Sequence, residues 1–242
     1  MEINTSVSED GLTVELGYKQ RNYRDEQVCG DTVVYQYLAD DRRLIVVLAD
    51  GMGHGESARK LSEQASGAII EAIRAGKKAP ETGREILKRF SATSGDPYNY
   101  STFTLLDIDL LGLRAGVLNH DNPASLVIRD GLPLQTDWTC LVMTEPGEKE
   151  QTVLVSRFGV EAGDRIVLVT DGVSKSGLNS EKYPFGWGNE GIAGFIGRAL
   201  VDVPALSAQA LAEEVVSEAV GLDEGVPKDD MSCVVIYFRT AE

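Results

Sequence analysis

The chain has 242 residues, of which 43% are hydrophobic, and this is enough for one sizeable core. Its 38 acidic and 23 basic residues give a net charge of −15, so we expect neither nucleic acid nor an anionic membrane surface as a partner. Widely spaced Cys29, Cys140 and Cys233 exclude a disulfide framework, and a polar opening without long apolar runs predicts no secretion signal or membrane span, hence a cytoplasmic protein.

The first part of the chain predicts strands followed by two helices. The unbroken aliphatic run at 44–48 is typical of a central strand that is buried on both faces. After it, apolar residues recur at three-to-four spacing, which indicates helices. The predicted elements are strands at residues 12–18, 33–38 and 43–49, the last two forming a hairpin, and helices at residues 56–75 and 80–90.

The second part predicts further strands, two more helices and a final strand. Strands are expected at residues 102–109, 113–118, 125–129, 152–158, 165–170 and 232–238, and helices at 190–200 and 205–220. Residues 139–144 form either another strand or an irregular excursion at the sheet edge. Gly, Pro and Asp divide the strands, which favours antiparallel pairing. We therefore predict an α+β fold in a single domain over 1–242: two stacked, mostly antiparallel sheets flanked by helix pairs, a four-layer α-β-β-α sandwich.

Acidic residues stand at the ends of several predicted strands. Asp50 and Asp171 each follow an apolar strand and precede a glycine, Asp229 and Asp230 precede the last strand, and Asp31 begins another. Carboxylates gathered at strand ends repel one another, and a hard divalent cation with oxygen ligands relieves this repulsion. The alternative is that Asp-Gly is a plain turn and that Asp31 is a solvated residue.

Five motifs in order carry a family resemblance: CGD at 29–31, DGMGHG at 50–55, NHDNP at 119–123, TDGVSKSG at 170–177 and KDDMS at 228–232. Together they resemble the bacterial PPM-type (type 2C-like) serine/threonine phosphatases, in the branch of sporulation stage II E and stress-response regulators. The resemblance implies the same α-β-β-α sandwich. It also implies two divalent cations, Mn²⁺ or Mg²⁺, which suit an oxygen-only ligand set.

The resemblance assigns roles to the acidic residues. It implies that Asp50 bridges the two ions, that the Gly51 carbonyl binds one of them, that Asp171 and Asp229 hold one ion, and that Asp31 lies beside the other. A slip of one residue would exchange Asp229 for Asp230, because side chains alternate along a strand.

The implied activity is hydrolysis of phosphoserine or phosphothreonine by a metal-activated water. The expected partner is a phosphorylated bacterial signalling protein, such as an anti-sigma-factor antagonist or a component of a stress complex. Two alternatives stay open, a regulatory module that binds a phosphoprotein without turnover and a hydrolase of small phosphoesters.

Several residues depart from the wider family or have two interpretations. Eukaryotic members have a histidine where this chain has Met52 and a phosphate-binding arginine where it has Glu26, for which Arg21 or Arg24 would have to substitute. We interpret His54 as a cap or packing residue and His120 as part of a loop structure. The loop at 178–189, with three aromatic residues, is either a substrate-facing flap or packing over the end of a sheet.

Overall fold

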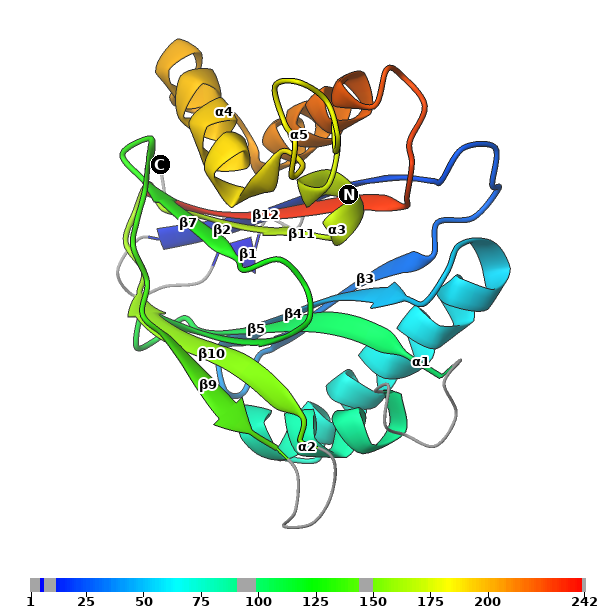
Figure 1. Cartoon of the computed structure of the whole chain (residues 1–242). Helices are drawn as coiled ribbons and strands as arrows, with labels where there is room; N and C mark the ends of the chain where they lie inside the picture. Colours follow the sequence, from blue (N-terminus) through cyan, green and yellow to red (C-terminus); the bar gives the residue numbers. More distant parts are fainter. Residues whose placement is uncertain (1–4, 7–11, 91–98, 144–149, 241–242) are drawn as a thin grey trace. The chain divides into compact units, whose positions relative to one another are not determined.

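The structure is a computed structural model that describes residues 5–6, 12–90, 99–143 and 150–240 (Figure 1). The described residues form two compact units, each of which is discontinuous in sequence. Unit 1 takes them from Met1–Gln27, Pro123–Gln135 and Val160–Glu242, and unit 2 from Val28–Asn122 and Thr136–Gly159. Each unit contains one six-stranded sheet, and the described strands pair only in antiparallel fashion.

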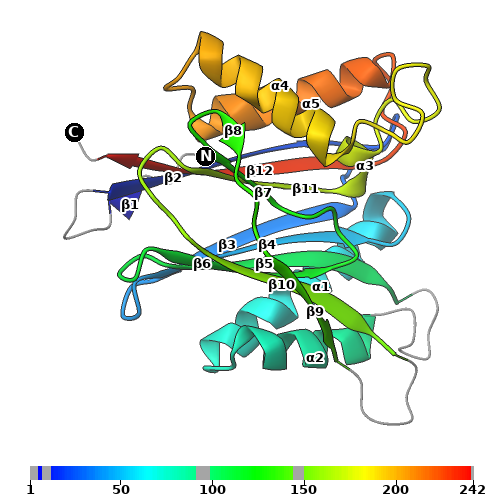
Figure 2. The same cartoon turned by 60° about the vertical axis from the view of Figure 1, so that its left-hand side comes forward.

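Unit 1 is a sheet covered by helices from the last third of the chain. Its strands, in spatial order, are β1 (Thr5–Ser6), β2 (Leu12–Arg21), β12 (Met231–Thr240), β11 (Arg165–Val169), β7 (Leu126–Arg129) and β8 (Leu132–Pro133). Its helices are α3 (Asp171–Ser174), α4 (Gly188–Asp202) and α5 (Ala208–Leu222). Apolar side chains of α4 and α5 pack against those of β11 and β12, and Figure 2 shows these two helices over the sheet.

Unit 2 repeats this arrangement with helices that follow directly after a hairpin. Its strand order is β3 (Asp31–Leu38), β4 (Arg43–Gly51), β5 (Ser101–Asp109), β6 (Arg114–His120), β10 (Thr152–Gly159) and β9 (Trp138–Val142). Helices α1 (Gly55–Arg74) and α2 (Ala79–Phe90) pack on one face of the sheet. All five aliphatic side chains at 44–48 are buried, as predicted.

The short strands β1 and β8 were not predicted, and three differences concern the helices. Helix α5 begins at Ala208, three residues later than expected, because the Ser207 side chain caps it by accepting a hydrogen bond from the Ala210 amide. The short helix α3 was not predicted. On α1, Ser62 and Ser66 are buried while Leu61 is partly exposed, so the packed face is more polar than the predicted apolar stripe.

Most of the segment at 139–144 belongs to a strand. Edge strand β9 ends at Val142, and residue 144 lies outside the described residues. None of the helices in the described part of the chain is both long and apolar enough to span a membrane.

Candidate functional site

Two of the predicted ligands, Asp31 and Asp50, lie directly opposite each other in unit 2. The β3–β4 hairpin pairs these two residues, so their side chains lie on the same face of the sheet. Asp31 is 0% exposed, whereas Asp50 is partly exposed. Like charges in directly opposite positions destabilise a sheet, because their Cβ atoms are only about 4.5–5.5 Å apart. A divalent cation between the two carboxylates would remove this penalty.

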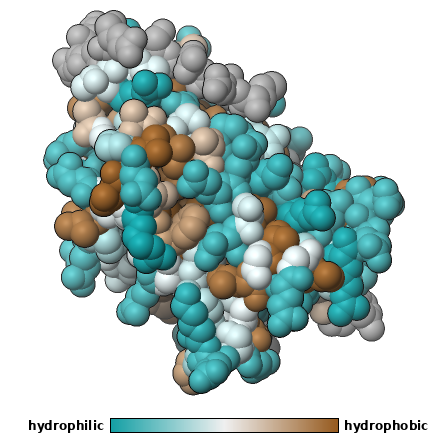
Figure 3. All heavy atoms as spheres, turned by 90° about the horizontal axis from the view of Figure 1, so that it is seen from above, coloured by the Kyte–Doolittle hydropathy of each residue, from teal (hydrophilic) through white to brown (hydrophobic). Residues whose placement is uncertain are grey.

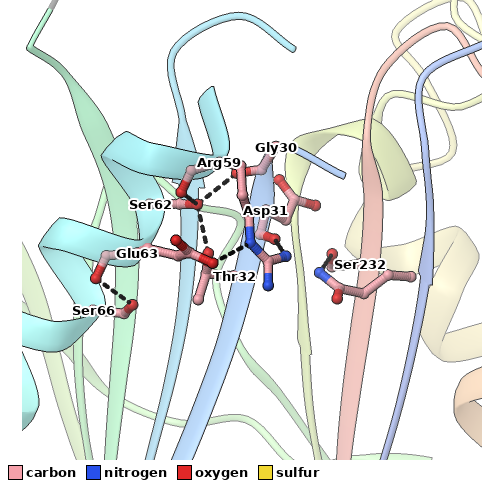
Figure 4. Close-up of polar contacts among 9 residues, drawn as sticks. Gly30, Asp31, Thr32, Arg59, Ser62, Glu63, Ser66 and Ser232 are labelled. Carbon is pink, nitrogen blue, oxygen red and sulfur yellow. Dashed lines mark hydrogen bonds and ion pairs between the residues drawn. The ribbon is translucent and has the colours of Figure 1, made fainter. Parts of the chain in front are cut away.

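Helix α1 holds the start of β3 in place through polar contacts. Arg59 donates a hydrogen bond from Nη1 to the Asp31 carbonyl oxygen at 2.8 Å, and Ser62 Oγ donates to the Gly30 carbonyl oxygen at 2.5 Å. The Thr32 and Ser62 hydroxyls are 2.6 Å apart. Figure 4 shows these α1 side chains directed toward the backbone at the start of β3. The position of Asp31 is therefore fixed by residues that the sequence analysis did not identify.

Gly51 is required by close packing at the end of β4. A Cβ atom at this position would lie 1.9 Å from the carbonyl oxygen of Ala58, in the first turns of α1. On the other side, the Ser101 hydroxyl donates to the Asp50 carbonyl oxygen at 2.8 Å. The Asp50–Gly51 backbone is thus held between α1 and β5, which gives this glycine a packing role in addition to the predicted carbonyl ligand.

In unit 1, Asp171 begins the short helix α3 directly after β11. Its Oδ2 atom accepts a hydrogen bond from Lys175 Nζ at 2.5 Å, one turn further along the chain. The ammonium group and the carboxylate are both accessible to solvent, with side-chain exposures of 59% and 30%. Asp171 therefore lies at the surface of its unit next to a positive charge.

The neighbouring residues Asp229 and Asp230 have different surroundings. Burial, followed by the negative charge of Asp171, raises the pKa of Asp229 above its ordinary value. Asp230 is buried and accepts a hydrogen bond from the Tyr23 amide at 2.8 Å. Gly172 lies so close that a Cβ there would be 2.1 Å from the Asp230 carbonyl oxygen. Asp229 is therefore the partner of Asp171, and Asp230 ties the start of β12 to the loop after β2.

The two histidines have different surroundings. His54 occupies the N-cap position of α1, is exposed, and makes no side-chain cap hydrogen bond. His120 is buried at the end of β6 between the rings of Tyr100 and Phe103, at centroid distances of 6.0 and 5.6 Å. Burial lowers the pKa of His120 below its ordinary value. The loop interpretation of His120 is wrong, because this residue ends strand β6 and packs between aromatic rings. His54 has the predicted position of a cap, but its side chain makes no cap hydrogen bond.

Loop 178–189 carries one buried and one exposed aromatic side chain. Trp187 is buried in the core of unit 1, where its ring meets Phe195 edge-on at 5.6 Å. Phe185 is 91% exposed. Packing thus accounts for Trp187 at the end of this loop but not for Phe185.

The five predicted ligands fall into two groups. Asp31, Asp50 and Gly51 belong to unit 2, and Asp171 and Asp229 belong to unit 1. Among the residues that the structure describes, no group of three or more Asp, Glu, His or Cys side chains is arranged to hold one ion. Pairs of carboxylates with backbone carbonyls and water are nevertheless the ligands that Mg²⁺ accepts, and the set contains only oxygen donors.

A comparison with models of protein families gives a match. The family model "Stage II sporulation protein E (SpoIIE)" matches residues 40–239. A search of curated proteins found no significant match.

Solved phosphatase domains resemble the chain over nearly its whole length. The phosphatase domain of SpoIIE from Bacillus subtilis, in a crystal form without domain swapping, has 19% identity and a TM-score of 0.69, covering 97% of this chain and 96% of that one. A longer SpoIIE fragment from the same organism gives 20% identity and a TM-score of 0.74, with 96% and 65% coverage. RsbX in complex with magnesium gives 16% identity and a TM-score of 0.59, with 98% and 100% coverage. These likenesses confirm the predicted fold class.

Proposed function

The chain belongs to the Stage II sporulation protein E (SpoIIE) family, and we propose that it is a metal-dependent phosphatase that acts on phosphoserine and phosphothreonine in a bacterial signalling protein. The family match and the fold confirm the resemblance predicted from the motifs and the predicted class, a protein phosphatase. The observation that carries the metal-dependent mechanism is the directly opposed pair of Asp31 and Asp50. Like charges directly opposite each other destabilise a sheet, whereas a cation site uses them as ligands.

Each predicted ligand has a part in the proposed mechanism. Asp50 would bridge two divalent cations, the Gly51 carbonyl and Asp31 would complete the ligands from unit 2, and Asp171 and Asp229 would bind from unit 1. When bound, Mn²⁺ or Mg²⁺ ions supply a hydroxide nucleophile at neutral pH and neutralise the phosphoryl oxygens. The chain's own contribution is to hold the carboxylates in place, through the contacts of α1 with β3 and of Gly172 with the Asp230 backbone.

The substrate proposed here is a phosphoprotein such as an anti-sigma-factor antagonist or a component of a stress complex, in the cytoplasm. Its support is the family and the likeness to phosphatases of bacterial signalling. In this proposal both units act together as one phosphatase domain over residues 1–242.

The test is hydrolysis of p-nitrophenyl phosphate and of a phosphoserine protein, with Mn²⁺ or Mg²⁺ and with EDTA. We expect turnover of both substrates by the wild type only with metal, and a loss of at least about a hundredfold in Asp50→Asn and Asp171→Asn. Asp41→Asn is the matched control. Asp41 lies at the opposite end of the β3–β4 hairpin, its side chain is 64% exposed, and its removal should leave the rate unchanged.

Other outcomes separate this proposal from its alternatives. Equal rates in the wild type and both variants would contradict the assigned carboxylates. Binding of the phosphoprotein without phosphate release would indicate a regulatory module. Turnover of p-nitrophenyl phosphate without turnover of any phosphoprotein would indicate a hydrolase of small phosphoesters.

A further inference from the structure

The loop between α3 and α4 presents an aromatic side chain to solvent. Phe185 is 91% exposed, the largest exposed fraction among the large hydrophobic side chains that the structure describes. Leaving such a side chain in water instead of burying it is unfavourable, so the fold gains nothing from its exposure. The surface on the side of α4 and α5 is otherwise largely hydrophilic, with hydrophobic residues in small groups (Figure 3).

The loop is tied to α3 on one side of Phe185. The next residue, Gly186, has a φ of +91°, and a Cβ atom there would lie 2.8 Å from both Lys175 Cα and Ser174 O. The Trp187 amide then donates to the Ser176 carbonyl oxygen at 2.9 Å. Trp187 itself is only 4% exposed and anchors the end of the loop in the core. The backbone that carries Phe185 is therefore fixed against α3.

Helix α3 is also the element that carries Asp171. Lys175 contacts the Gly186 backbone and at the same time donates its hydrogen bond to the Asp171 carboxylate. Phe185 is thus the neighbour of Gly186, whose backbone packs against the end of α3, and α3 begins with the proposed metal ligand Asp171. An extended peptide advances about 3.3 Å per residue, so a side chain two or three positions from a phosphoserine reaches about 7–10 Å from it.

We infer that Phe185 is a specificity-determining residue, which contacts an apolar side chain close to the phosphorylated residue of the protein substrate. The inference rests on the proposed function and adds to it the kind of sequence that the enzyme prefers. An aromatic side chain on a fixed backbone suits this purpose, because little backbone entropy is lost when the side chain is covered. A small phosphoester without flanking residues does not reach such a contact.

The experiment measures kcat/KM for a series of phosphoserine peptides with Mn²⁺. Each peptide has a Gly-Ser background and one leucine, placed in turn at each of the three positions before and the three positions after the phosphoserine. We expect the wild type to prefer at least one leucine peptide over the background peptide by about tenfold, the lower end of the range for one apolar contact. The Phe185→Ala variant should lose this preference and keep its rate on the background peptide.

Val201→Ala provides the matched control, because Val201 is a 79% exposed apolar residue on α4 of the same unit. This variant should keep the leucine preference. The inference is overturned if the wild type hydrolyses the background peptide and every leucine peptide at equal kcat/KM, or if Phe185→Ala retains the preference. Failure of the proposed function looks different, since the wild type would then hydrolyse none of the peptides. Thermal melts of Phe185→Ala should match the wild type, because the side chain packs against little in the fold.

Discussion

The carboxylate pair of Asp31 and Asp50 predicts that neutralising one of them stabilises the metal-free protein. In Asp50→Asn the side chain keeps its size and loses its charge. Two unit charges about 5 Å apart repel by about 3 kcal/mol at an effective dielectric constant of 20, and by about 1 kcal/mol in water. Because Asp31 is buried while Asp50 is partly exposed, we expect a gain of about 1–2 kcal/mol, within these two limits.

The assay is thermal unfolding in EDTA and in increasing Mn²⁺. For a chain of this length a gain of 1 kcal/mol raises Tm by about 2–4 °C, so Asp50→Asn in EDTA should melt a few degrees above the wild type. Saturation to a hundred times Kd stabilises a folded protein by about 2.7 kcal/mol, so Mn²⁺ should raise the Tm of the wild type by several degrees. The variant should lose most of this metal-dependent rise.

The opposite signs in EDTA and in Mn²⁺ make this prediction specific. Asp41→Asn is again the control and should leave both Tm values close to those of the wild type. If Asp50→Asn melts below the wild type in EDTA and still gains stability from Mn²⁺, the two carboxylates neither repel each other nor hold a cation, and the reasoning from their register is wrong.

Two further predictions follow from single residues. Gly51→Ala should reduce the free energy of unfolding in EDTA by about 1–3 kcal/mol and so lower Tm, because the new Cβ would lie 1.9 Å from the Ala58 carbonyl oxygen. Gly67→Ala, in an open position of α1, is the control and should raise Tm slightly. Burial lowers the pKa of His120, so the unfolded state binds the extra proton: the stability that this residue contributes is complete above its ordinary pKa of 6.5 and is lost as pH falls through the lower folded pKa. Between pH 7.5 and pH 5 the Tm of the wild type should therefore fall more steeply than the Tm of His120→Gln. Equal slopes would show that His120 does not bind its proton more tightly in the unfolded state.

The hairpin and its acidic pair could be predicted from local sequence. Strands at 33–38 and 43–49 with a short turn between them already place residue 31 opposite residue 50 in an antiparallel pair, and the structure has this register. The pairing of β2 with β12 has no such local signal. It joins Leu12–Arg21 to Met231–Thr240, and hydrophobic periodicity describes each strand without naming its partner.

The resemblance assigned the ligand role to Asp229, but spacing alone does not distinguish it from Asp230. In sequence the two residues are equivalent, since either could begin the last strand. In the folded chain the Asp230 carboxylate accepts a hydrogen bond from the Tyr23 amide, which is more than 200 residues away in sequence. Asp229 is the residue whose pKa is raised by the charge of Asp171. A tertiary hydrogen bond of this kind cannot be found from spacing within the motif.

Helix α1 shows why periodicity predicts packing better than it predicts a site. The apolar repeat correctly places one face of this helix against the sheet, yet Ser62 on that face is fully buried. Its hydroxyl would cost free energy there without partners, and it bonds to Gly30 and Thr32 on either side of Asp31. A polar residue inside an apolar stripe is therefore a sign that the helix supports a backbone segment as well as a core. In this chain the supported segment is the one that carries a proposed ligand, and Ser62 and Arg59 together link the packing of α1 to the position of Asp31.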